Sequence, residues 1–419
     1  MIATAPHIAD SLDSAVELEK RRLVQNYSRH RLLLDRGKGV HVYDADRKRY
    51  LDFITGIGVN ALGHGHPRLM KALREQAGKL IHCSNLYYHR FQGPLAARLA
   101  EMSGLERAFF SNSGAEAVEG ALKIAKGYGR ARSETKHEIV ALEGAFGGRT
   151  LAAVAVTGQA KYREPFEPLM PGVRFIPVND EAALEQAVGP NTAGIIIEPI
   201  LGEGGIVEVS RGFAAKAADL ARQHDALLIL DEIQCGLGRA GSYFAFQDWR
   251  QAGTDGTGVK IEPDIVTIAK PLAGGLPLGA ILASEKAAAV LGAGMHGSTF
   301  GGGVLACRLA LEFLDVMEEQ LPMIREIGHG FRRRLEELEL KYDFVKGVRG
   351  RGLMLGLVLD FPGKEVVEKA QDRGLLINCT AGNVLRFLPP YIVERRHVDQ
   401  AVATLDAIFE ERLSGAREE

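Results

Sequence analysis

Two charged residues near the middle of the chain end two apolar segments, and together they could do chemistry. Asp231 ends the segment ALLILD, and Lys270 ends the segment DIVTIAK. Each apolar run is typical of a buried strand, so the two side chains should lie where strands leave the sheet. Ligands of open α/β sheets bind at that edge. An acid and an amine followed by glycines suit a pyridoxal phosphate enzyme, in which a lysine holds the cofactor and a carboxylate faces its ring nitrogen.

The two charges could also be unrelated, with Lys270 exposed after its strand and Asp231 capping a turn. A second motif adds weight to the cofactor hypothesis, because the phosphate of the cofactor must bind somewhere. In SNSGAEA, Ser113 and Gly114 lie between the apolar AFF and an alanine-rich segment typical of a helix. Free backbone N–H groups at such a helix start form a phosphate site. The simpler interpretation, a serine N-cap with Glu116 in the first turn, is compatible with this one.

Three arginines stand in apolar or glycine-rich surroundings. Arg149 lies in GAFGGRT, Arg351 in RGRGLM and Arg386 in the apolar VLRFLPP. An arginine within an apolar strand usually has a carboxylate partner, because burying an unpaired charge is costly. That carboxylate could belong to the protein or to a substrate that is bound bidentately. Glu203, in EPILGEGG, is a further acid just past a strand end.

Two other motifs match known signatures poorly. GLGRAG, residues 236–241, satisfies the dinucleotide fingerprint G-x-G-x-x-G, which would indicate a nicotinamide-dependent oxidoreductase. The aromatic continuation SYFAFQDW does not resemble a crossover helix, so this alternative is remote. In GHGHP, His64 and His66 have no clear third ligand, and a turn is favoured over a metal site.

The composition argues against several other classes of protein. The 51 Lys and Arg residues nearly balance the 53 Asp and Glu residues, so neither nucleic acid nor a membrane surface is an expected partner. The four cysteines form no C-x-x-C pair, the first residues lack the pattern of a signal peptide, and no apolar run approaches the ~18 residues of a membrane span. We therefore expect a cytoplasmic protein with reduced thiols.

The segments that must position these residues alternate between strand and helix patterns. Helical segments such as FAAKAADLARQHD precede several of the apolar runs. This alternation predicts an α/β protein with a mostly parallel sheet covered by helices. The strand candidates are AFF, EIVAL, RFIPV, GIIIEPILG, ALLILD and DIVTIAK.

The two ends of the chain have different patterns, which predict a smaller α+β unit built from both. Residues 10–22 favour an amphipathic helix, and GVHVYDADRKRYLDF favours a hairpin that turns at 44–47. After residue 304 come a long helical stretch, a strand pair, a helix around 364–373, a strand near VLRFLPP and a final helix. We expect three segments: 1–67, packing with the small domain; 68–303, the large cofactor-binding domain; and 304–419, the small domain. RQAGTDGTGVKIEPD reads as a surface loop, and its residues 251–260 could contact a second subunit.

The motifs together resemble class III aminotransferases, the ornithine/GABA type of pyridoxal phosphate enzyme. SNSGAEAVEGALKIAK, GAFGGRTLAAVAVTG, IIEPILGEGG, LILDEIQCGLGRAG, PDIVTIAKPLAGGLPLGA and HGSTFGGG occur in the family's order. The resemblance runs from about Tyr27 to beyond residue 400. It implies the fold-type I architecture, with a large doubly wound domain, a small domain from both chain ends, and a homodimer with shared active sites.

The resemblance also implies roles for individual residues. Lys270 would anchor the cofactor and Asp231 would face its ring nitrogen. Gln234 would bind the ring oxygen and Phe146 would stack on the ring, while Ser113, Gly114 and Ala115, with Thr299 of the other subunit, would hold the phosphate. For substrates it implies Arg149 for the distal carboxylate, Arg386 for the carboxylate next to the reacting carbon, Glu203 as the partner of Arg386 when that carboxylate is missing, and Ser298 and Tyr27 nearby.

Within the family, GIGVNALGHGHP, VRGRGLMLGLVL and LLINCTAGNVLRFLPP are most similar to acetylornithine aminotransferases. This similarity predicts transfer of the terminal amino group of N2-acetylornithine to 2-oxoglutarate, giving N-acetylglutamate 5-semialdehyde and glutamate, a step of arginine biosynthesis. GABA, succinylornithine, succinyl-diaminopimelate and ornithine remain alternative donors. Two positions depart from the family pattern: Gly147 stands where many relatives carry histidine, and Ile57 where ornithine aminotransferases carry a tyrosine, which argues against free ornithine.

Overall fold

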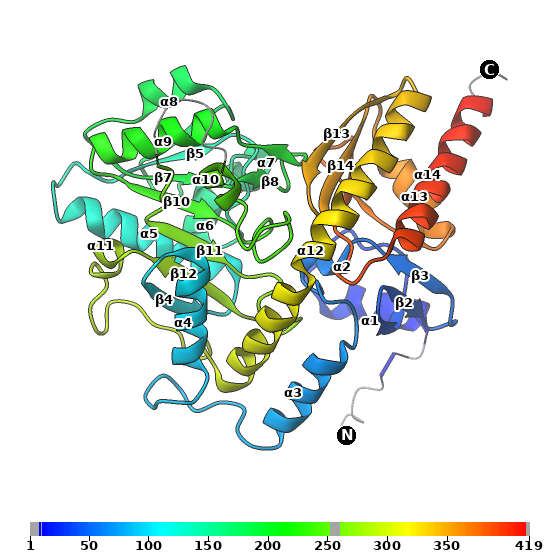
Figure 1. Ribbon diagram of the computed structural model, residues 1–419, viewed down its shortest axis with the longest axis horizontal. Helices are drawn as coiled ribbons and strands as arrows, with labels where there is room; N and C mark the ends of the chain where they lie inside the picture. The colour runs from blue at the N-terminus through cyan, green and yellow to red at the C-terminus, as the bar shows by residue number, and fades with distance from the viewer. Residues whose placement is uncertain (1–7, 10, 252–259, 416–419) are drawn as a thin grey trace.

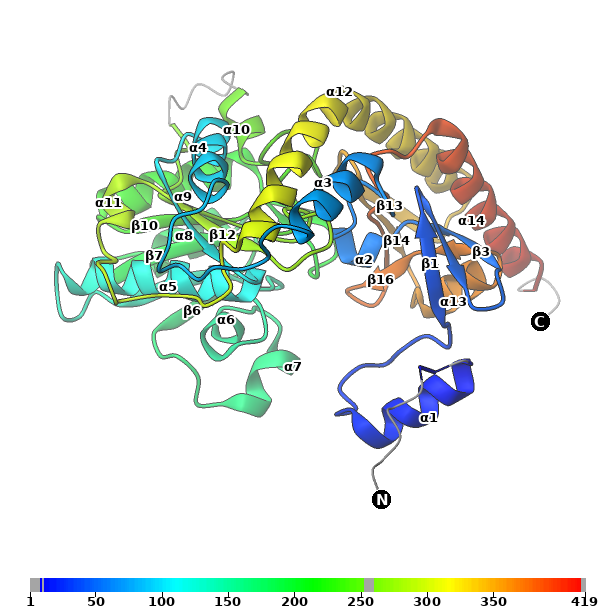
Figure 2. The ribbon, with the colours of Figure 1, turned by 90° about the horizontal axis from the view of Figure 1, so that it is seen from below.

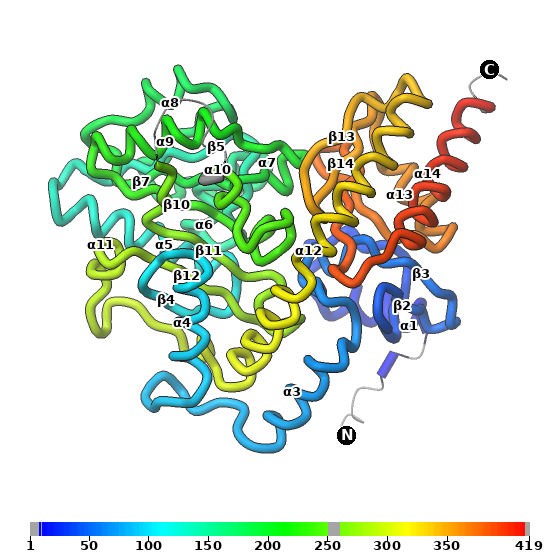
Figure 3. Tube along the Cα trace, in the orientation of Figure 1, coloured from blue at the N-terminus to red at the C-terminus, as the bar shows by residue number. Residues whose placement is uncertain are grey.

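The structure is a computed structural model that describes residues 8–9, 11–251 and 260–415. A large sheet with helices on both faces lies beside a group of smaller sheets, and one long helix runs along both parts (Figure 1). The tube in Figure 3 shows both ends of the described chain on the side of the smaller sheets. The predicted surface loop at 251–260 falls almost entirely outside the described residues.

The large sheet has seven strands, all parallel except β12. Sequence analysis assigned no strand to β12, a short apolar segment that runs antiparallel to both of its neighbours. Mostly parallel pairing confirms the predicted fold class. The order is β4 (Arg107–Ser111), β12 (Gly279–Ala283), β11 (Ile265–Ile268), β10 (Leu227–Asp231), β7 (Thr192–Ile197), β5 (Glu138–Leu142) and β6 (Val173–Ile176).

Both faces of this sheet are buried, which explains why its strands are apolar without interruption. In β10, Leu227 and Ile229 pack into the apolar cluster that contains α5 (Gly114–Arg130). Leu228 and Leu230 pack into the opposite cluster, with α9 (Arg211–Gln223) and α4 (Gln92–Ser103). Figure 2 shows α5 on one side of the sheet and α4 and α9 on the other. Successive side chains of a strand point to opposite faces, so a strand that is covered twice must be apolar at every position.

The smaller part joins the two ends of the chain. Its first sheet pairs β3, near the amino terminus, in parallel with β15, more than 300 positions later. The predicted hairpin corresponds to β2 and β3. Its two sheets are β1 (Leu34–Lys38), β2 (His41–Asp44), β3 (Arg49–Asp52) and β15 (Leu375–Leu376); and β13 (Val345–Arg351), β14 (Met354–Leu359), β17 (Val384–Phe387) and β16 (Asn378–Thr380). In the larger part, the chain between β7 and α9 forms a separate two-stranded sheet of β8 (Ile200–Leu201) and β9 (Val207–Glu208).

The predicted helices are present, with small shifts at their ends. The amino-terminal helix is α1, and the helix predicted around 364–373 is α13. Among the described residues, no helix is both long and apolar enough to cross a bilayer. Besides α4, α5 and α9, the helices are α1 (Leu12–Arg22), α2 (Thr55–Gly58), α3 (Pro67–Ala77), α6 (Leu151–Ala155), α7 (Ala160–Arg163), the 3-10 helix η1 (Glu164–Phe166), α8 (Glu181–Ala187), α10 (Gln247–Gln251), α11 (Glu285–Ala288), α12 (Val304–Lys341), α13 (Lys364–Asp372) and α14 (Arg395–Gly415).

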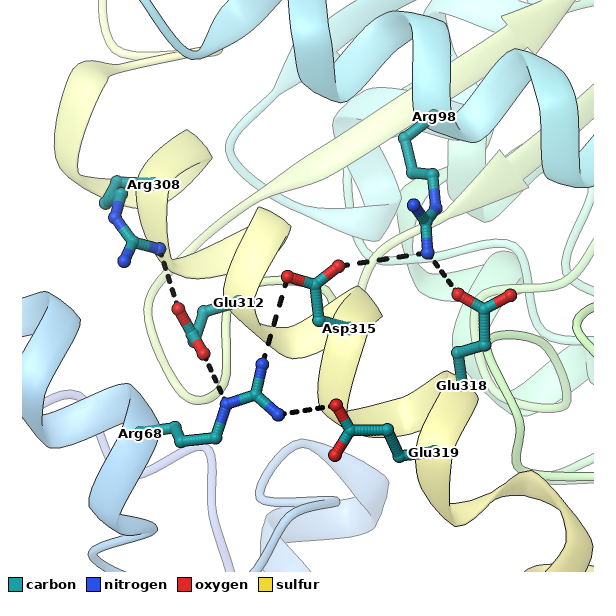
Figure 4. A network of polar contacts seen from close by, with 7 residues as sticks. All are labelled: Arg68, Arg98, Arg308, Glu312, Asp315, Glu318 and Glu319. Carbon is teal, nitrogen blue, oxygen red and sulfur yellow. Dashed lines mark hydrogen bonds and ion pairs between the residues drawn. The ribbon is translucent and has the colours of Figure 1, made fainter.

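Ion pairs attach the 38-residue helix α12 to α3 and α4 (Figure 4). Arg68 of α3 donates to Glu312 over 2.6 Å and to Glu319 over 2.7 Å. Arg98 of α4 donates to Glu318, and Asp315 lies between the two arginines, within 4 Å of each (Figure 4). Exposed ion pairs are individually weak, but Glu312 is only 14% exposed and also accepts from Arg308 over 3.0 Å. Glu312 is therefore the member of this network most protected from solvent screening.

Replacing Glu312 by Gln should destabilise the protein by about 1 kcal/mol at neutral pH, because a charge-assisted hydrogen bond is lost. Partial burial opposes the ionisation of Glu312, but its bonds to Arg68 and Arg308 outweigh burial and hold the pKa of this carboxyl below its ordinary value. A carboxyl whose pKa is lower in the folded state stabilises above its unfolded pKa, and this stabilisation disappears as the pH falls through the folded value.

Thermal unfolding measured from pH 7 to pH 3 tests this prediction. The Tm difference between wild type and Glu312→Gln should shrink toward the acidic end. Glu336→Gln, which removes an exposed pair with Arg332 on the same helix, is the matched control and should lower Tm less. A pH-independent difference, or equal losses in both variants, would contradict a stabilising role of the Glu312 charge.

Candidate active site

A cavity of about 410 Å³ lies at the carboxyl ends of the parallel strands. Residues far apart in the sequence meet there, because parallel strands all deliver their following loops to the same edge of the sheet. Of the predicted site residues, the cavity is lined by Ser113, Gly114, Ala115, Phe146, Arg149, Glu203, Asp231, Gln234 and Lys270.

Asp231 and Lys270 come from neighbouring strands. Asp231 is the last residue of β10 and pairs in register with Thr267 of β11, three residues before Lys270. The carboxylate of Asp231 accepts from the backbone N–H of Ile233 over 3.0 Å. Desolvation lowers the pKa of Lys270, while the negative charge of Asp231 opposes this shift. A lower pKa makes the neutral amine easier to form, and a nucleophile or general base needs that form.

The start of α5 forms another wall of the cavity. The Oγ of Ser113 caps this helix by accepting from the backbone N–H of Glu116 over 3.2 Å, and the carboxylate of Glu116 accepts from the N–H of Asn112 over 2.6 Å. The predicted N-cap is thus present. Gly114 and Ala115 occupy the first helical turn, where N–H groups have no partner within the helix and the helix dipole favours an anion. A Cβ on Gly114 would come within 2.9 Å of the Ile233 side chain.

A buried ion pair closes the side of the cavity that faces the smaller sheets. Nη1 of Arg386, in β17, donates to Glu203 Oε1 over 2.6 Å and to Gln234 Oε1 over 3.1 Å. Arg386 is 1% exposed, and it also donates to the backbone carbonyl of Gly202. Gly202 has no room for a side chain, because a Cβ there would lie 2.3 Å from Gln234 Oε1. The structure therefore places Glu203 against Arg386, the contact that the resemblance implies.

Arg149 differs from Arg386 because it has no carboxylate partner among the described residues. It follows the loop after β5 and lines the cavity with an exposed side chain. The preceding glycines pack tightly: a Cβ on Gly147 would meet the backbone carbonyl oxygen of Ala153 at 2.6 Å. A side chain at position 147 would force this loop to shift, so the loop is shaped around the glycine found there.

Glu198 is a cavity residue that sequence analysis overlooked. It follows β7 directly, as Asp231 ends the neighbouring β10, and it accepts from the N–H groups of Phe146 over 2.6 Å and Gly202 over 3.2 Å. Burial raises the pKa of Glu198, and the nearby Asp231 raises it further. The signal was present in the sequence, because GIIIEP ends an apolar run with an acid just as ALLILD does.

Four predicted residues do not line this cavity. One is Arg386, which bonds to the lining residues Glu203 and Gln234 without lining the cavity itself. The others are Ser298, Thr299 and Tyr27. Ser298 and Thr299 line a neighbouring cavity, which shares Asn112 with the first. Ser298 Oγ accepts from the Asn112 side chain over 3.1 Å. Tyr27 is 69% exposed and follows α1. This placement does not support a role for these three residues, Thr299, Ser298 and Tyr27, in the active site of their own chain. Their role in the active site of a partner subunit stays a prediction.

The remaining motifs of the sequence analysis, those of Arg351, His64 and residues 236–241, have structural explanations. Arg351 lies near Glu208 and Asp248 and donates to the carbonyl of Ala245, so its partners belong to the protein. The ring of His64 lies 2.8 Å from Asp52 Oδ2. Residues 236–241 form turns without leading directly into a helix. Within the described part of the chain, no group of three or more His, Cys, Asp or Glu residues could hold a metal ion.

The residues of the cavity fit pyridoxal phosphate. The cavity offers an amine on Lys270, helix N–H groups for a phosphate and an aromatic face on Phe146. Two buried acids, Asp231 and Glu198, face the cavity, and neither forms an ion pair within the residues that the structure describes. Burial raises the pKa of Asp231, so its charge is costly without a cation. A protonated ring nitrogen would supply that cation.

Fold and site together define a pyridoxal phosphate enzyme of the aminotransferase type, and comparison with known proteins agrees. The family model for Aminotransferase class-III matches residues 24–409, and the chain belongs to this family. It is 46% identical over 404 residues to acetylornithine aminotransferase of Methanocaldococcus jannaschii, covering 96% of this chain and 99% of that protein. It is also 46% identical to the Aquifex aeolicus acetylornithine aminotransferase, covering 92% and 99%. The crystal structure of ornithine aminotransferase from Toxoplasma gondii superposes with a TM-score of 0.89 at 33% identity, covering 96% of each chain.

Lys270→Ala should lose covalent attachment of the cofactor and about 10²- to 10⁴-fold in activity, because the amine that moves the proton is removed. Borohydride should fix pyridoxal phosphate to the wild-type chain, so that its absorbance persists after denaturation. It should fix none to the variant. Lys71→Ala, an exposed lysine of α3, is the control and should behave as wild type. Retention of the reduced cofactor by Lys270→Ala would show that another lysine is the anchor.

Proposed function

We propose that this aminotransferase moves the terminal amino group of N2-acetylornithine to 2-oxoglutarate, giving N-acetylglutamate 5-semialdehyde and glutamate in arginine biosynthesis. The observation that carries the proposal is the pairing of the buried Arg386 with Glu203, which lines the cavity, while Arg149, which also lines it, has no carboxylate partner among the described residues. The two relatives with 46% identity that are named acetylornithine aminotransferase support the choice of donor.

The pairing suits two substrates that must share one site. An ω-amine donor has no carboxylate next to its reacting carbon, so Glu203 neutralises the buried Arg386 while this donor is bound. Glutamate and 2-oxoglutarate bring their own carboxylate to Arg386, and Glu203 must then move aside. Glu203 retains partial solvent exposure at 27%, whereas Arg386 is almost completely buried, so the acid is the partner with room to move. Arg149 holds the carboxylate at the far end of either substrate.

The chain's own groups can carry the proton transfers. When bound, pyridoxal phosphate supplies an aldehyde that takes up the amino group and a ring that withdraws electrons from the neighbouring carbon. Lys270 Nζ takes the proton from the substrate's reacting carbon and delivers it to the cofactor, a role that needs the lowered pKa of this amine. Asp231 balances the charge of the ring nitrogen. The N terminus of α5 orients the phosphate, and the aromatic ring of Phe146 forms a wall of the cavity against which the cofactor ring can stack.

We also propose a homodimer with shared active sites. The segments 80–88 and 295–301 are joined by hydrogen bonds from Asn85 to the carbonyls of Ser298 and Gly301, and together they expose seven large apolar side chains. Such a patch is typical of an interface, and Thr299 lies within it, next to the cavity that adjoins the active site. Sedimentation equilibrium should give the mass of two chains, and a single-chain mass would contradict sharing. The exposed apolar residues are Leu80, Ile81, Leu86, Tyr87, Tyr88, Met295 and Phe300.

We place the protein in the cytoplasm, because all four of its cysteines are free thiols in the structure and a reducing compartment preserves such thiols.

A donor screen with 2-oxoglutarate as acceptor tests the substrate assignment. N-acetylornithine should give the highest kcat/KM among N-acetylornithine, ornithine, GABA, succinylornithine, succinyl-diaminopimelate and lysine. Lys270→Ala serves as the inactive control for each donor. A preference for GABA would overturn the assignment of the donor and leave the aminotransferase chemistry in place, whereas inactivity with every donor would contradict the function itself.

Glu203→Ala should let α-amino acids compete with the ω-amine donor. Without this carboxylate, Arg386 has no internal acid to displace, and the ratio of kcat/KM for glutamate to that for N-acetylornithine should rise about tenfold, the weight of one charge-assisted hydrogen bond. Single-turnover absorbance changes of the cofactor measure both half-reactions. Glu203→Gln, which keeps the shape but not the charge, should change the ratio in the same direction. Equal half-reaction rates in wild type and variants would exclude the switch.

A further inference from the structure

The guanidinium of Arg149 has an aromatic partner that no part of the proposed mechanism uses. Its central carbon lies 3.9 Å from the ring centroid of Tyr162, a residue of α7. The ring of Phe146 is further away, at 5.4 Å. A guanidinium 3.9 Å above a ring is in the range of a cation–π contact, and arginine makes such contacts with its flat face.

Tyr162 is held in place by contacts of its ring and of the short helix that carries it. Its ring meets that of Phe146 edge to face, with centroids 6.3 Å apart and planes at 88°. Its backbone N–H donates to the carbonyl of Gln159, and the next residue, Arg163, donates to the carbonyl of Thr157 over 2.9 Å. Arg163 also stacks on Phe175 of β6 at 4.3 Å. The short helix α7 is thus attached to the large sheet, and the Tyr162 ring is a fixed surface.

Arg149 needs such a surface because it has a long side chain, an exposed position and no carboxylate partner among the described residues. A free arginine of this kind samples many rotamers, and a substrate that binds it must bear the cost of ordering them. Stacking on a ring uses the face of the guanidinium and leaves the N–H donors at its edge free. Those donors are the ones that bind a carboxylate bidentately.

We propose that Tyr162 is a positioning residue that holds Arg149 ready for a substrate carboxylate far from the reacting amine, and so contributes to selection of such substrates. The inference rests on the proposed function, in which Arg149 binds the distal carboxylate. It extends that function to a residue that lies outside the lining of the cavity. The substrate class is an ω-amine or 2-oxo acid with a carboxylate at the remote end.

Half-reaction kinetics of Tyr162→Leu test the proposal. With N-acetylornithine, the half-saturating concentration should rise about two- to fivefold, the usual weight of an exposed cation–π contact, while the limiting rate stays unchanged. A plain diamine such as 1,4-diaminobutane has no carboxylate, and its kinetics should not change. The dissociation constant of glutarate, which has two carboxylates and no amine, should rise by the same factor in calorimetric titration.

Three further variants make the outcome decisive. Tyr162→Phe keeps the ring and should resemble wild type. Arg149→Ala combined with Tyr162→Leu should be no worse than Arg149→Ala alone, because the ring acts only through the guanidinium. Phe166→Leu, an exposed aromatic of the following turn outside the cavity, is the matched control and should change nothing.

The alternative results separate a failed inference from a failed function. If 1,4-diaminobutane and N-acetylornithine are affected equally, or the double variant shows additive losses, Tyr162 is a structural residue and the proposal is wrong. If Tyr162→Leu unfolds, Tyr162→Met repeats the test with an unbranched side chain of similar reach. If N-acetylornithine is not a donor, GABA, which also has a remote carboxylate, takes its place, and the inference is judged on the same comparison with 1,4-diaminobutane.

Discussion

A buried positive charge at the junction of the two parts of the molecule constrains much of the site. Arg386 comes from β17 of the smaller part, and its guanidinium lies against Glu203, Gln234 and the carbonyl of Gly202, all from the larger part. Removing the charge of an arginine from water without compensation costs several kcal/mol, and Arg386 is only 1% exposed. The carboxylate of Glu203 supplies this compensation where the two parts meet. Any substrate that displaces this acid must bring its own carboxylate.

The other charges of the cavity follow from the same rule. Asp231 and Glu198 end adjacent strands, and desolvation raises the pKa of both. A cofactor ring with a protonated nitrogen would lower the cost of burying these charges, because it would neutralise the carboxylate of Asp231. Desolvation also lowers the pKa of Lys270. The cavity thus disfavours the charged forms of its own acids and of its own base, a pattern typical of sites that transfer protons.

Much of the fold could be predicted because buried parallel strands and amphipathic helices leave strong local patterns. The uninterrupted apolar run before Asp231 exists because β10 is covered on both faces, and this pattern is readable without coordinates. The strand β12 escaped prediction because its five residues have no flanking signal and pair antiparallel, against the expectation of a parallel neighbour. Glu198 was overlooked although it ends its apolar run as Asp231 does, because the same motif, GIIIEPILGEGG, contains a second acid, Glu203, five residues later. Tyr162 could not be found at all, because a tyrosine in KYREPF has no pattern that points to Arg149.

The sequence alone determined which chemical groups are present and at which edge of the sheet they occur. Lys270 and Asp231 end apolar runs, Ser113 starts a helix, and these local signals suffice to predict an amine, an acid and a phosphate site at one edge. Only the tertiary structure decided which partner each arginine has: Glu203 for Arg386, acids of the protein for Arg351, and the ring of Tyr162, in place of an acid, for Arg149. The physical reason is distance. Strand and helix patterns depend on neighbours a few residues apart. Glu203 is 183 positions from Arg386, and Asp248 is 103 positions from Arg351. Even Tyr162, 13 positions from Arg149, lies beyond the repeat of a helix or strand.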